Sequence, residues 1–163
     1  HQSKNINMES NLTPKKVSEG EYMISKNILF GFYSSDLSEE AQLELEKLYQ
    51  VMSENPEVKV EVTGFTDSKG SAEYNKILSA RRTRSVVDYL VDRGISKERF
   101  ISKAVGESKQ FAINKNPDGT DNPEGRRYNR QVEINLVNTG NKEIWTEEYL
   151  VPERLKPEAA KNY

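Results

Sequence analysis

The chain has 163 residues, of which 34% are hydrophobic and 31% are charged, so its length suits one domain with a core of its own. The 24 basic and 26 acidic side chains leave a net charge of -2, which offers no general attraction to a nucleic-acid backbone, and no apolar run approaches the roughly 20 residues of a membrane helix. The absence of cysteine excludes disulfides, thiolate zinc sites and cysteine nucleophiles, and it suits a reducing cytosol and a disulfide-poor periplasm equally well.

The N-terminal residues 1–26 are polar and show no sustained periodicity, so we expect them to form a tail or a linker between domains. Neither a signal peptide nor a lipid-attachment cysteine opens the chain. We therefore expect any targeting segment to lie upstream or to have been removed.

A strand and a helix are expected next. The segment NILFGFY, residues 27–33, is rich in residues that favour β-strands. The following segment, SEEAQLELEKLYQVMSENP, offers Ser38 as N-cap, acids in its first turn and Pro56 beyond its end. Its apolar residues recur at helical spacing, and they are Ala41, Leu45, Leu48 and Met52.

A second strand and a second helix follow. The segment EVKVEVTG, residues 57–64, alternates valines with polar residues, which is typical of a strand with one buried face. From about Ser71 to Arg93 the apolar residues have helical spacing, and Gly94 suits the left-handed position after a helix. A turn that contains Gly70 must join the two elements.

The last two expected strands are RFISKAVGE, residues 99–107, and NRQVEINLV, residues 129–137. The segment between them, SKQFAINKNPDGTDNPEGRRY, is rich in turn-forming residues, so we expect an irregular connection. The order β-α-β-α-β-β predicts an α+β fold, a two-layer sandwich in which both helices cover one face of a mixed sheet.

We place this domain at residues 27–138 and treat residues 139–163 as a C-terminal extension. The extension carries the large apolar side chains of Trp145, Tyr149 and Leu150. We expect these side chains to dock the extension against the domain.

Asp67 lies in the turn before the second helix, and Asn75 and Arg82 project from one face of that helix because they are two turns apart. Arg81 and Arg84 lie about 100° and 200° around the helix from Arg82, so only one of these arginines should face the turn. An aspartate and an arginine that do not fully satisfy each other suit a zwitterion with an ammonium and a carboxylate. The alternative, which spacing alone favours, is that Asp67 caps the next turn and Arg82 forms a surface ion pair.

Two stretches, TGFTDSKGSAEYNKILSARRTRSVVDYLVDRGI and EGRRYNRQVEINL, together resemble the peptidoglycan-binding domain shared by OmpA, the lipoprotein Pal and the flagellar stator protein MotB. The similarity covers about residues 27–138. The family pattern of G-H-T-D, G, N, L-S, R, V, Y-L, G-I, G-R, N-R and V-E matches in order. Such a long ordered set is more specific than any of its pieces.

The resemblance implies that Asp67 binds the ammonium and Arg82 the carboxylate at the free end of meso-diaminopimelate in the peptidoglycan stem peptide. Lysine-type peptidoglycan lacks this carboxylate, which would cost about 1 to 3 kcal/mol of binding. The resemblance also implies a groove lined by the residues at other pattern positions, which are Phe65, Thr66, Asn75, Leu78 and Arg130.

The resemblance further implies a non-catalytic module, without cofactor, that anchors an outer-membrane or envelope protein to the cell wall in the periplasm of a diderm bacterium. It implies an upstream membrane-attached region or envelope protein as partner and no insertion of this part into the membrane.

Three positions depart from the family pattern. Phe65 stands where the family usually has histidine, Gly31 replaces a frequent aspartate, and Gln131 replaces the second arginine of N-R-R. We expect these changes to lower affinity without abolishing binding. The alternative is that the groove has lost its ligand and the domain serves as a protein-interaction module on the same scaffold.

The segment NKNPDGTDNPEG partly imitates a calcium loop, with Asn114, Asn116 and Asp118 at alternating positions, but Gly125 occupies the position of the bidentate acid. We therefore expect turns there and no metal site. An enzyme would need a nucleophile or a general base, yet cysteine is absent and His1 is the one histidine. We expect no catalysis.

A nucleic-acid surface would need aromatic side chains among its arginines, and no such pattern accompanies the arginines of this chain. We therefore expect no nucleic-acid partner. Arg126 and Arg127 are instead expected to fix the turn-rich connection or to approach the glycan.

Overall fold

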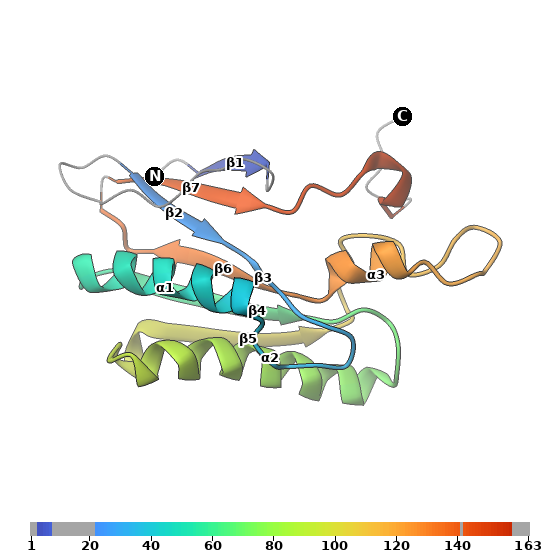
Figure 1. Ribbon diagram of the computed structural model, residues 1–163, viewed down its shortest axis with the longest axis horizontal. Helices are drawn as coiled ribbons and strands as arrows, with labels where there is room; N and C mark the ends of the chain where they lie inside the picture. The colour runs from blue at the N-terminus through green and yellow to red at the C-terminus, as the bar shows by residue number, and fades with distance from the viewer. Residues whose placement is uncertain (1–2, 8–21, 141, 158–163) are drawn as a thin grey trace.

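Two layers make up the main body of the protein, a four-stranded mixed sheet and two long helices packed against it, and a second sheet of three strands lies beside them (Figure 1). The computed structural model describes residues 3–7, 22–140 and 142–157. The α+β class and the mixed sheet predicted from the sequence are confirmed.

The central strand of the larger sheet is β4, which pairs in parallel with β5 and antiparallel with β6, while β3 pairs antiparallel with β6. The alternating valines of β4 behave as predicted, since Val60 and Val62 are fully buried. In order across the sheet, the strands are β3 (Ile28–Leu29), β6 (Gln131–Val137), β4 (Lys59–Phe65) and β5 (Phe100–Gly106).

The two long helices, α1 (Glu39–Glu54) and α2 (Ala72–Asp92), confirm the helical predictions. Ser38 and Ser71 are their N-caps, and each hydroxyl accepts a hydrogen bond from a backbone N–H in the first turn, at 3.0 and 3.1 Å. Gly94 has a φ of 105°, the left-handed conformation expected after α2. The helices bury their apolar stripes against β3, β4 and β6 in one core.

The smaller sheet includes part of the segment that we expected to be a tail or linker. Its strands, in order, are β1 (Ser3–Asn7), β7 (Glu143–Glu148) and β2 (Tyr22–Lys26). Both β1 and β2 pair in parallel with β7, so the N-terminal segment and the C-terminal extension meet. The domain boundaries at residues 26 and 138 stay predictions.

Asn27 links β2 to β3 and ties the two sheets together. Its amide Nδ2 donates to Gln131 Oε1 at 2.9 Å, and its Oδ1 accepts from Ile134 N at 3.0 Å. The amide of Gln131 in turn donates to Tyr128 O at 2.7 Å. Gln131, which departs from the family pattern, therefore has a structural role as a buried neutral donor and acceptor.

Two predictions of local structure were wrong. The strand expected over residues 27–33 ends at Leu29, because the chain turns after Gly31 to reach α1. The expected irregular connection contains a third helix, α3 (Pro123–Asn129), which begins with Asn122 as N-cap and a proline at N1. Its seven residues are too few to show helical periodicity.

The C-terminal extension does dock on the domain, through Ile144, which joins the hydrophobic core, and through Leu155. This side chain is 1% exposed, its carbonyl accepts a hydrogen bond from Ile113 N at 2.8 Å, and Leu150 is exposed. Tyr149 is half-buried, and the side chain of Trp145 lies outside the described residues. Two short 3-10 helices, η1 (Lys97–Arg99) and η2 (Glu153–Leu155), complete the described elements.

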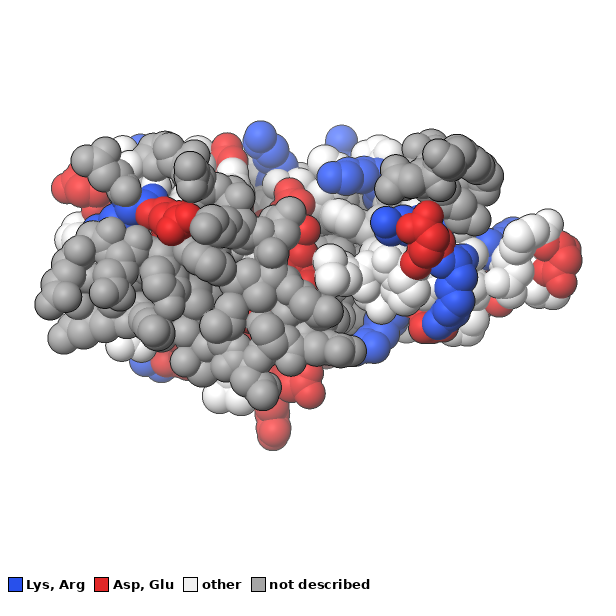
Figure 2. Space-filling view, turned by 90° about the horizontal axis from the view of Figure 1, so that it is seen from above, with Lys and Arg blue, Asp and Glu red and all other residues white. Residues whose placement is uncertain are grey.

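Basic and acidic side chains are interspersed over the described part of the face in Figure 2. Such a mixed surface gives no field of one sign on that face. This distribution agrees with the small net charge of the chain.

Close packing of α2 on β4 depends on Gly64. A Cβ atom at this position would lie 2.3 Å from Ser79 O and 2.9 Å from Thr83 Cγ2. We expect Gly64→Ala to lower the free energy of unfolding by about 1 to 3 kcal/mol in urea denaturation, because α2 must shift. Gly31→Ala is the control, since its Cβ meets only Ser34 Cβ at 3.7 Å. Equal effects of the two substitutions would contradict this account.

Candidate functional site

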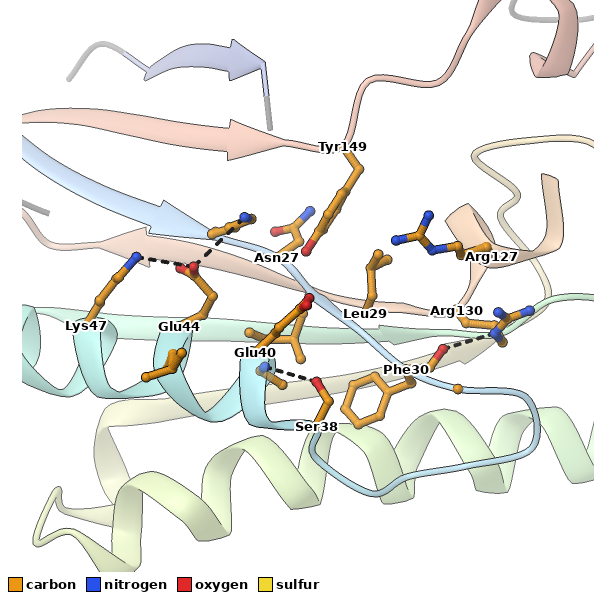
Figure 3. A pocket seen from close by; sticks show the side chains of 15 residues that line it. Asn27, Leu29, Phe30, Ser38, Glu40, Glu44, Lys47, Arg127, Arg130 and Tyr149 are labelled. Carbon is orange, nitrogen blue, oxygen red and sulfur yellow. Dashed lines mark hydrogen bonds and ion pairs between the residues drawn. The ribbon is translucent and has the colours of Figure 1, made fainter. Parts of the chain in front are cut away.

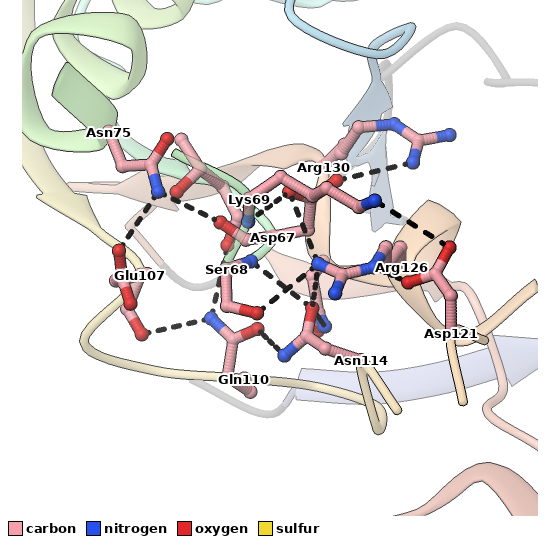
Figure 4. A network of polar contacts seen from close by, with 12 residues as sticks. Asp67, Ser68, Lys69, Asn75, Glu107, Gln110, Asn114, Asp121, Arg126 and Arg130 are labelled. Atoms are coloured by element: carbon pink, nitrogen blue, oxygen red, sulfur yellow. Dashed lines mark hydrogen bonds and ion pairs between the residues drawn. The ribbon is translucent and has the colours of Figure 1, made fainter. Parts of the chain in front are cut away.

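Asp67 lies in the turn between β4 and α2, and Asn75 from α2 and Arg130 from the start of β6 reach the same place (Figure 4). The end of β5 lies beside this turn, since Thr66 N donates to Gly106 O at 2.9 Å. Segments far apart in the sequence therefore build one site.

Asp67 is the acid at the centre of the site, and it is 4% exposed. Its Oδ1 accepts a hydrogen bond from Lys69 N at 2.9 Å, which closes the turn as the alternative interpretation expected. Two guanidinium groups also approach it: Arg130 Nη1 lies 3.4 Å from Oδ2, and Arg126 Nη1 lies 3.7 Å from Oδ1. Neither contact is a short bidentate pair, so Asp67 retains accepting capacity.

Two polar atoms near Asp67 lack hydrogen-bond partners. Asn75 Nδ2 donates to Asp67 O at 3.3 Å and to Glu107 Oε1 at 2.9 Å, but Asn75 Oδ1 accepts nothing from the described residues. The hydroxyl of Thr66 is likewise buried without a partner there. Such atoms are rare in folded proteins and call for an explanation.

Arg82 is fully buried, so the interpretation of a surface ion pair was wrong. Its Nη1 donates to Phe65 O at 2.9 Å. The other two bonds reach the loop after β3, from Nε to Ser34 O at 2.8 Å and from Nη2 to Gly31 O at 3.1 Å. Burial lowers the pKa of Arg82 to about 10, against the opposite effect of the nearby Asp67 charge.

Only one of the three clustered arginines of α2 faces the site, as predicted. Arg81 and Arg84 are exposed, whereas Arg82 points into the protein. The loop of residues 31–36 covers its guanidinium, and Ser85 Oγ also holds this loop by donating to its backbone at 2.7 Å.

Tyr33 combines ring contacts with a strained backbone in the covering loop. Its ring stacks on Phe32 with centroids 4.1 Å apart and meets Tyr74 edge-on at 5.7 Å. Its φ of 50° lies in the left-handed region, which is unfavourable for a bulky side chain. A Cβ atom at Gly70 would lie 3.4 Å from the Tyr33 hydroxyl, so this end of the loop lies close to the turn before α2.

Phe65 and Leu78 are structural neighbours of the site. Both are 3% exposed. The ring of Phe65 packs edge-on against Phe111, with centroids 4.9 Å apart, and Lys109 Nζ lies 5.8 Å from its centre. A phenylalanine at this position therefore fills an aromatic cluster beneath the turn and supplies no hydrogen bond.

Several supporting residues were not predicted as site residues. Arg126 Nε donates to Asp121 Oδ1 at 2.5 Å, and this pairing fixes the connection before α3 as expected for Arg126. Asn114 Oδ1 accepts from Ser68 N at 3.2 Å, and Gln110 Nε2 donates to Thr66 O at 3.0 Å. The G-R of the family pattern marked Arg126, but no sequence signal marked the two amide side chains.

The partial calcium-loop pattern forms turns. Asp118 Oδ1 accepts from the backbone and the hydroxyl of Thr120, at 3.0 and 2.6 Å, and these bonds lower the pKa of Asp118. Within the described residues there is no cluster of three or more His, Cys, Asp or Glu side chains able to hold a metal ion.

Comparison with known proteins places the site in a family context. The model of the OmpA family matches residues 29–124. Outer membrane protein A of Serratia marcescens is 40% identical over 89 residues, which are 53% of this chain and 25% of that protein. The photosystem I P700 chlorophyll a apoprotein A2 of Gloeobacter violaceus is 39% identical over 117 residues, 72% of this chain but only 13% of that protein. The chain thus spans a small part of these relatives.

Solved structures share the fold. The peptidoglycan-associated lipoprotein of Burkholderia pseudomallei superimposes with a TM-score of 0.59 and 22% identity, covering 68% of this chain and 88% of that structure. The C-terminal domain of Helicobacter pylori MotB gives a TM-score of 0.61 and 24% identity, covering 71% and 86%. At these identities the likeness establishes the fold alone.

Because Arg82 holds three backbone carbonyls, we expect Arg82→Ala to lower the free energy of unfolding by about 2 to 5 kcal/mol, as these buried acceptors lose their donor. Urea denaturation measures the effect. The exposed Arg84 provides a matched control, whose alanine variant should change stability by no more than about 0.5 kcal/mol. Similar values for both variants would show that the carbonyl contacts do not stabilise the fold.

Proposed function

The chain belongs to the OmpA family, and on that premise we propose that it binds peptidoglycan noncovalently and without catalysis, through the free end of diaminopimelate in the stem peptide. A solved protein of the same fold is named as peptidoglycan-associated. The proposal assigns the ammonium of the ligand to Asp67 and its carboxylate to Arg82.

The observation that carries the proposal is the pair of partnerless polar atoms beside Asp67. An ammonium group needs several acceptors, and the Asp67 carboxylate, Asn75 Oδ1 and Thr66 Oγ1 have unused accepting capacity. Leaving such groups unsatisfied costs about 1 to 3 kcal/mol each, which a bound ammonium would offset. A turn with a purely structural role has no need of these unpaired atoms.

A ligand carboxylate adjacent to that ammonium would meet the guanidinium of Arg82. The three bonds from Arg82 to backbone carbonyls leave some of its N–H donors unused. Arg82 stays charged at neutral pH because its pKa, although lowered, is about 10. Arg130 adds a second positive charge at the rim, 3.4 Å from Asp67.

Ligand entry to Arg82 requires the loop of residues 31–36 to move, because two carbonyls of this loop accept hydrogen bonds from the guanidinium. The left-handed Tyr33 makes such movement less costly. A non-glycine residue in this region stores about 1 to 3 kcal/mol of strain, which is released if the loop opens. Phe65 and Leu78 would support the ligand from beneath without bonding to it.

The same proposal gives the chain a role as a wall anchor in the periplasm of a diderm bacterium, attached to an envelope protein or a membrane region upstream. Among the described residues, no helix has the length and apolar character needed to cross a bilayer. Attachment to a membrane would therefore come from outside these residues.

A second candidate function is a protein-interaction module with a closed groove. The observation in its favour is that Arg82 is fully buried and bonded to backbone carbonyls. The proposed clamp, which consists of Asp67 and Arg82, is therefore closed in this conformation. The departures at Gly31 and Phe65 also favour this function, because these residues lack the polar side chains, aspartate and histidine, that the family pattern has there.

Calorimetric titration with a diaminopimelate stem peptide and its lysine counterpart separates the two functions. We expect the diaminopimelate peptide to bind saturably at micromolar to millimolar concentration. The affinity for the lysine peptide should be about 5- to 150-fold lower, since Arg82 loses a charged partner. Asp67→Asn, which keeps the shape of the side chain, should lower the affinity for the diaminopimelate peptide by a similar factor.

Asp88→Asn, an exposed acid on α2, is the matched control and should bind as the wild type does. Arg82→Lys, which retains the positive charge, should reduce discrimination between the peptides, provided circular dichroism shows a native fold. If neither peptide gives a heat of binding, or if Asp67→Asn binds the diaminopimelate peptide as the wild type does, the clamp hypothesis is rejected in favour of the protein-interaction module.

A further inference from the structure

A pocket of about 570 Å³ lies between the first half of α1, the β2–β3 segment and the end of β7 (Figure 3). This volume is within the range typical of small-molecule sites, about 300 to 1,000 Å³. Lys26, Arg127 and Tyr149 line it from positions outside the matched family region of residues 29–124. The pocket is therefore built partly by elements that the family model does not cover.

Tyr149 supplies an aromatic wall. Its side chain points from the end of β7 into the pocket (Figure 3), and Lys26 Nζ lies 5.6 Å from the centre of its ring. Burial raises the pKa of the Tyr149 hydroxyl. The ring is half-buried, so part of it remains accessible from the pocket.

The pocket also presents one free acid and one free base. Glu40 and Arg127 are exposed side chains that line the pocket and have no hydrogen bond or ion pair with any described residue. The remaining charges are paired: Lys26 Nζ lies 3.2 Å from a carboxylate oxygen of Glu147, and Lys47 Nζ lies 3.3 Å from one of Glu44. An aromatic ring between opposite free charges suits a neutral, strongly polar ligand.

Arg130 connects this pocket with the site at Asp67. It lines the pocket, its Nε donates to Phe30 O at 3.0 Å, and its Nη1 contacts Asp67 Oδ2 at 3.4 Å. Gly31 also lines the pocket and accepts a bond from Arg82 Nη2. Gly31 and Arg130 therefore belong both to the wall of the pocket and to the surroundings of Asp67 and Arg82.

We propose that this pocket binds the glycan part of the same peptidoglycan molecule, an N-acetylated aminosugar packed on the Tyr149 ring. A sugar ring offers a face of C–H groups to the aromatic wall and a rim of hydroxyl and amide groups to Glu40, Arg127 and the Tyr149 hydroxyl. The inference rests on the proposed stem-peptide site, because continuity with that site identifies the occupant.

The test uses three probes in calorimetry: the diaminopimelate tripeptide, the same tripeptide carrying its N-acetylated disaccharide, and the free disaccharide. Wild-type protein should bind the glycosylated tripeptide about tenfold more tightly than the bare one. Tyr149→Ala and Arg127→Ala should each remove most of that advantage and leave the affinity for the bare tripeptide unchanged. Arg84→Ala, an exposed arginine on another face of α2, should keep the advantage.

Equal affinities of the wild type for the two tripeptides would overturn the inference. The inference would also be overturned if Tyr149→Ala lowered the affinity for both tripeptides to the same extent, since Tyr149 would then serve to stabilise the fold. Tyr149→Phe separates the contribution of the ring from that of the hydroxyl. This variant should retain more of the preference for the glycosylated tripeptide than Tyr149→Ala does.

Failure of the bare tripeptide to bind would reject the proposed function and not the pocket itself. In that case the free disaccharide decides: binding that Tyr149→Ala abolishes supports the sugar site, and absence of binding rejects it.

Discussion

The buried guanidinium of Arg82 holds together the three segments that make the site. It joins the loop after β3, the end of β4 and the helix α2 by bonds from one side chain to three backbone carbonyls. Removing the charge from water lowers the pKa of Arg82 to about 10, and the nearby Asp67 charge opposes this effect. The covering loop and the end of β4, which leads into the turn at Asp67, are therefore both tied to α2.

In this site, the contacts that stabilise the closed conformation also limit access to the groups proposed to bind the ligand. The bonds that fix Arg82 also cover it, and the same compact turn leaves Thr66 Oγ1 and Asn75 Oδ1 buried without partners among the described residues. Unsatisfied atoms and a left-handed Tyr33 both raise the energy of the closed conformation. The large core beneath the sheet tolerates these local costs. A ligand that supplies the missing donors gains more from binding here than it would on a fully satisfied surface.

Local patterns predicted the elements that bury one regular face. Alternating valines identified β4, and serine caps with periodic apolar residues identified α1 and α2, because short-range chemistry decides these features. The shared face of Asn75 and Arg82 followed from helical geometry. The burial of Arg82 could not be predicted, because it depends on carbonyls about 50 residues away, at Gly31 and Ser34. The pairing of β1 and β2 with β7 is equally non-local, and α3 is too short for periodicity to reveal it.

The departures from the family pattern can be explained by where they lie. Gln131 bonds to Asn27, which lines the pocket, and Gly31 lines the pocket and accepts a bond from Arg82. A second arginine in place of Gln131 would bring an extra charge to a buried position where a neutral amide both donates and accepts. Both positions therefore lie on the side of the site where Tyr149 of the extension lines the pocket. Asp67, Asn75 and Arg82 keep the residue types of the pattern, so the changes at Gly31 and Gln131 leave the charged groups of the proposed site in place.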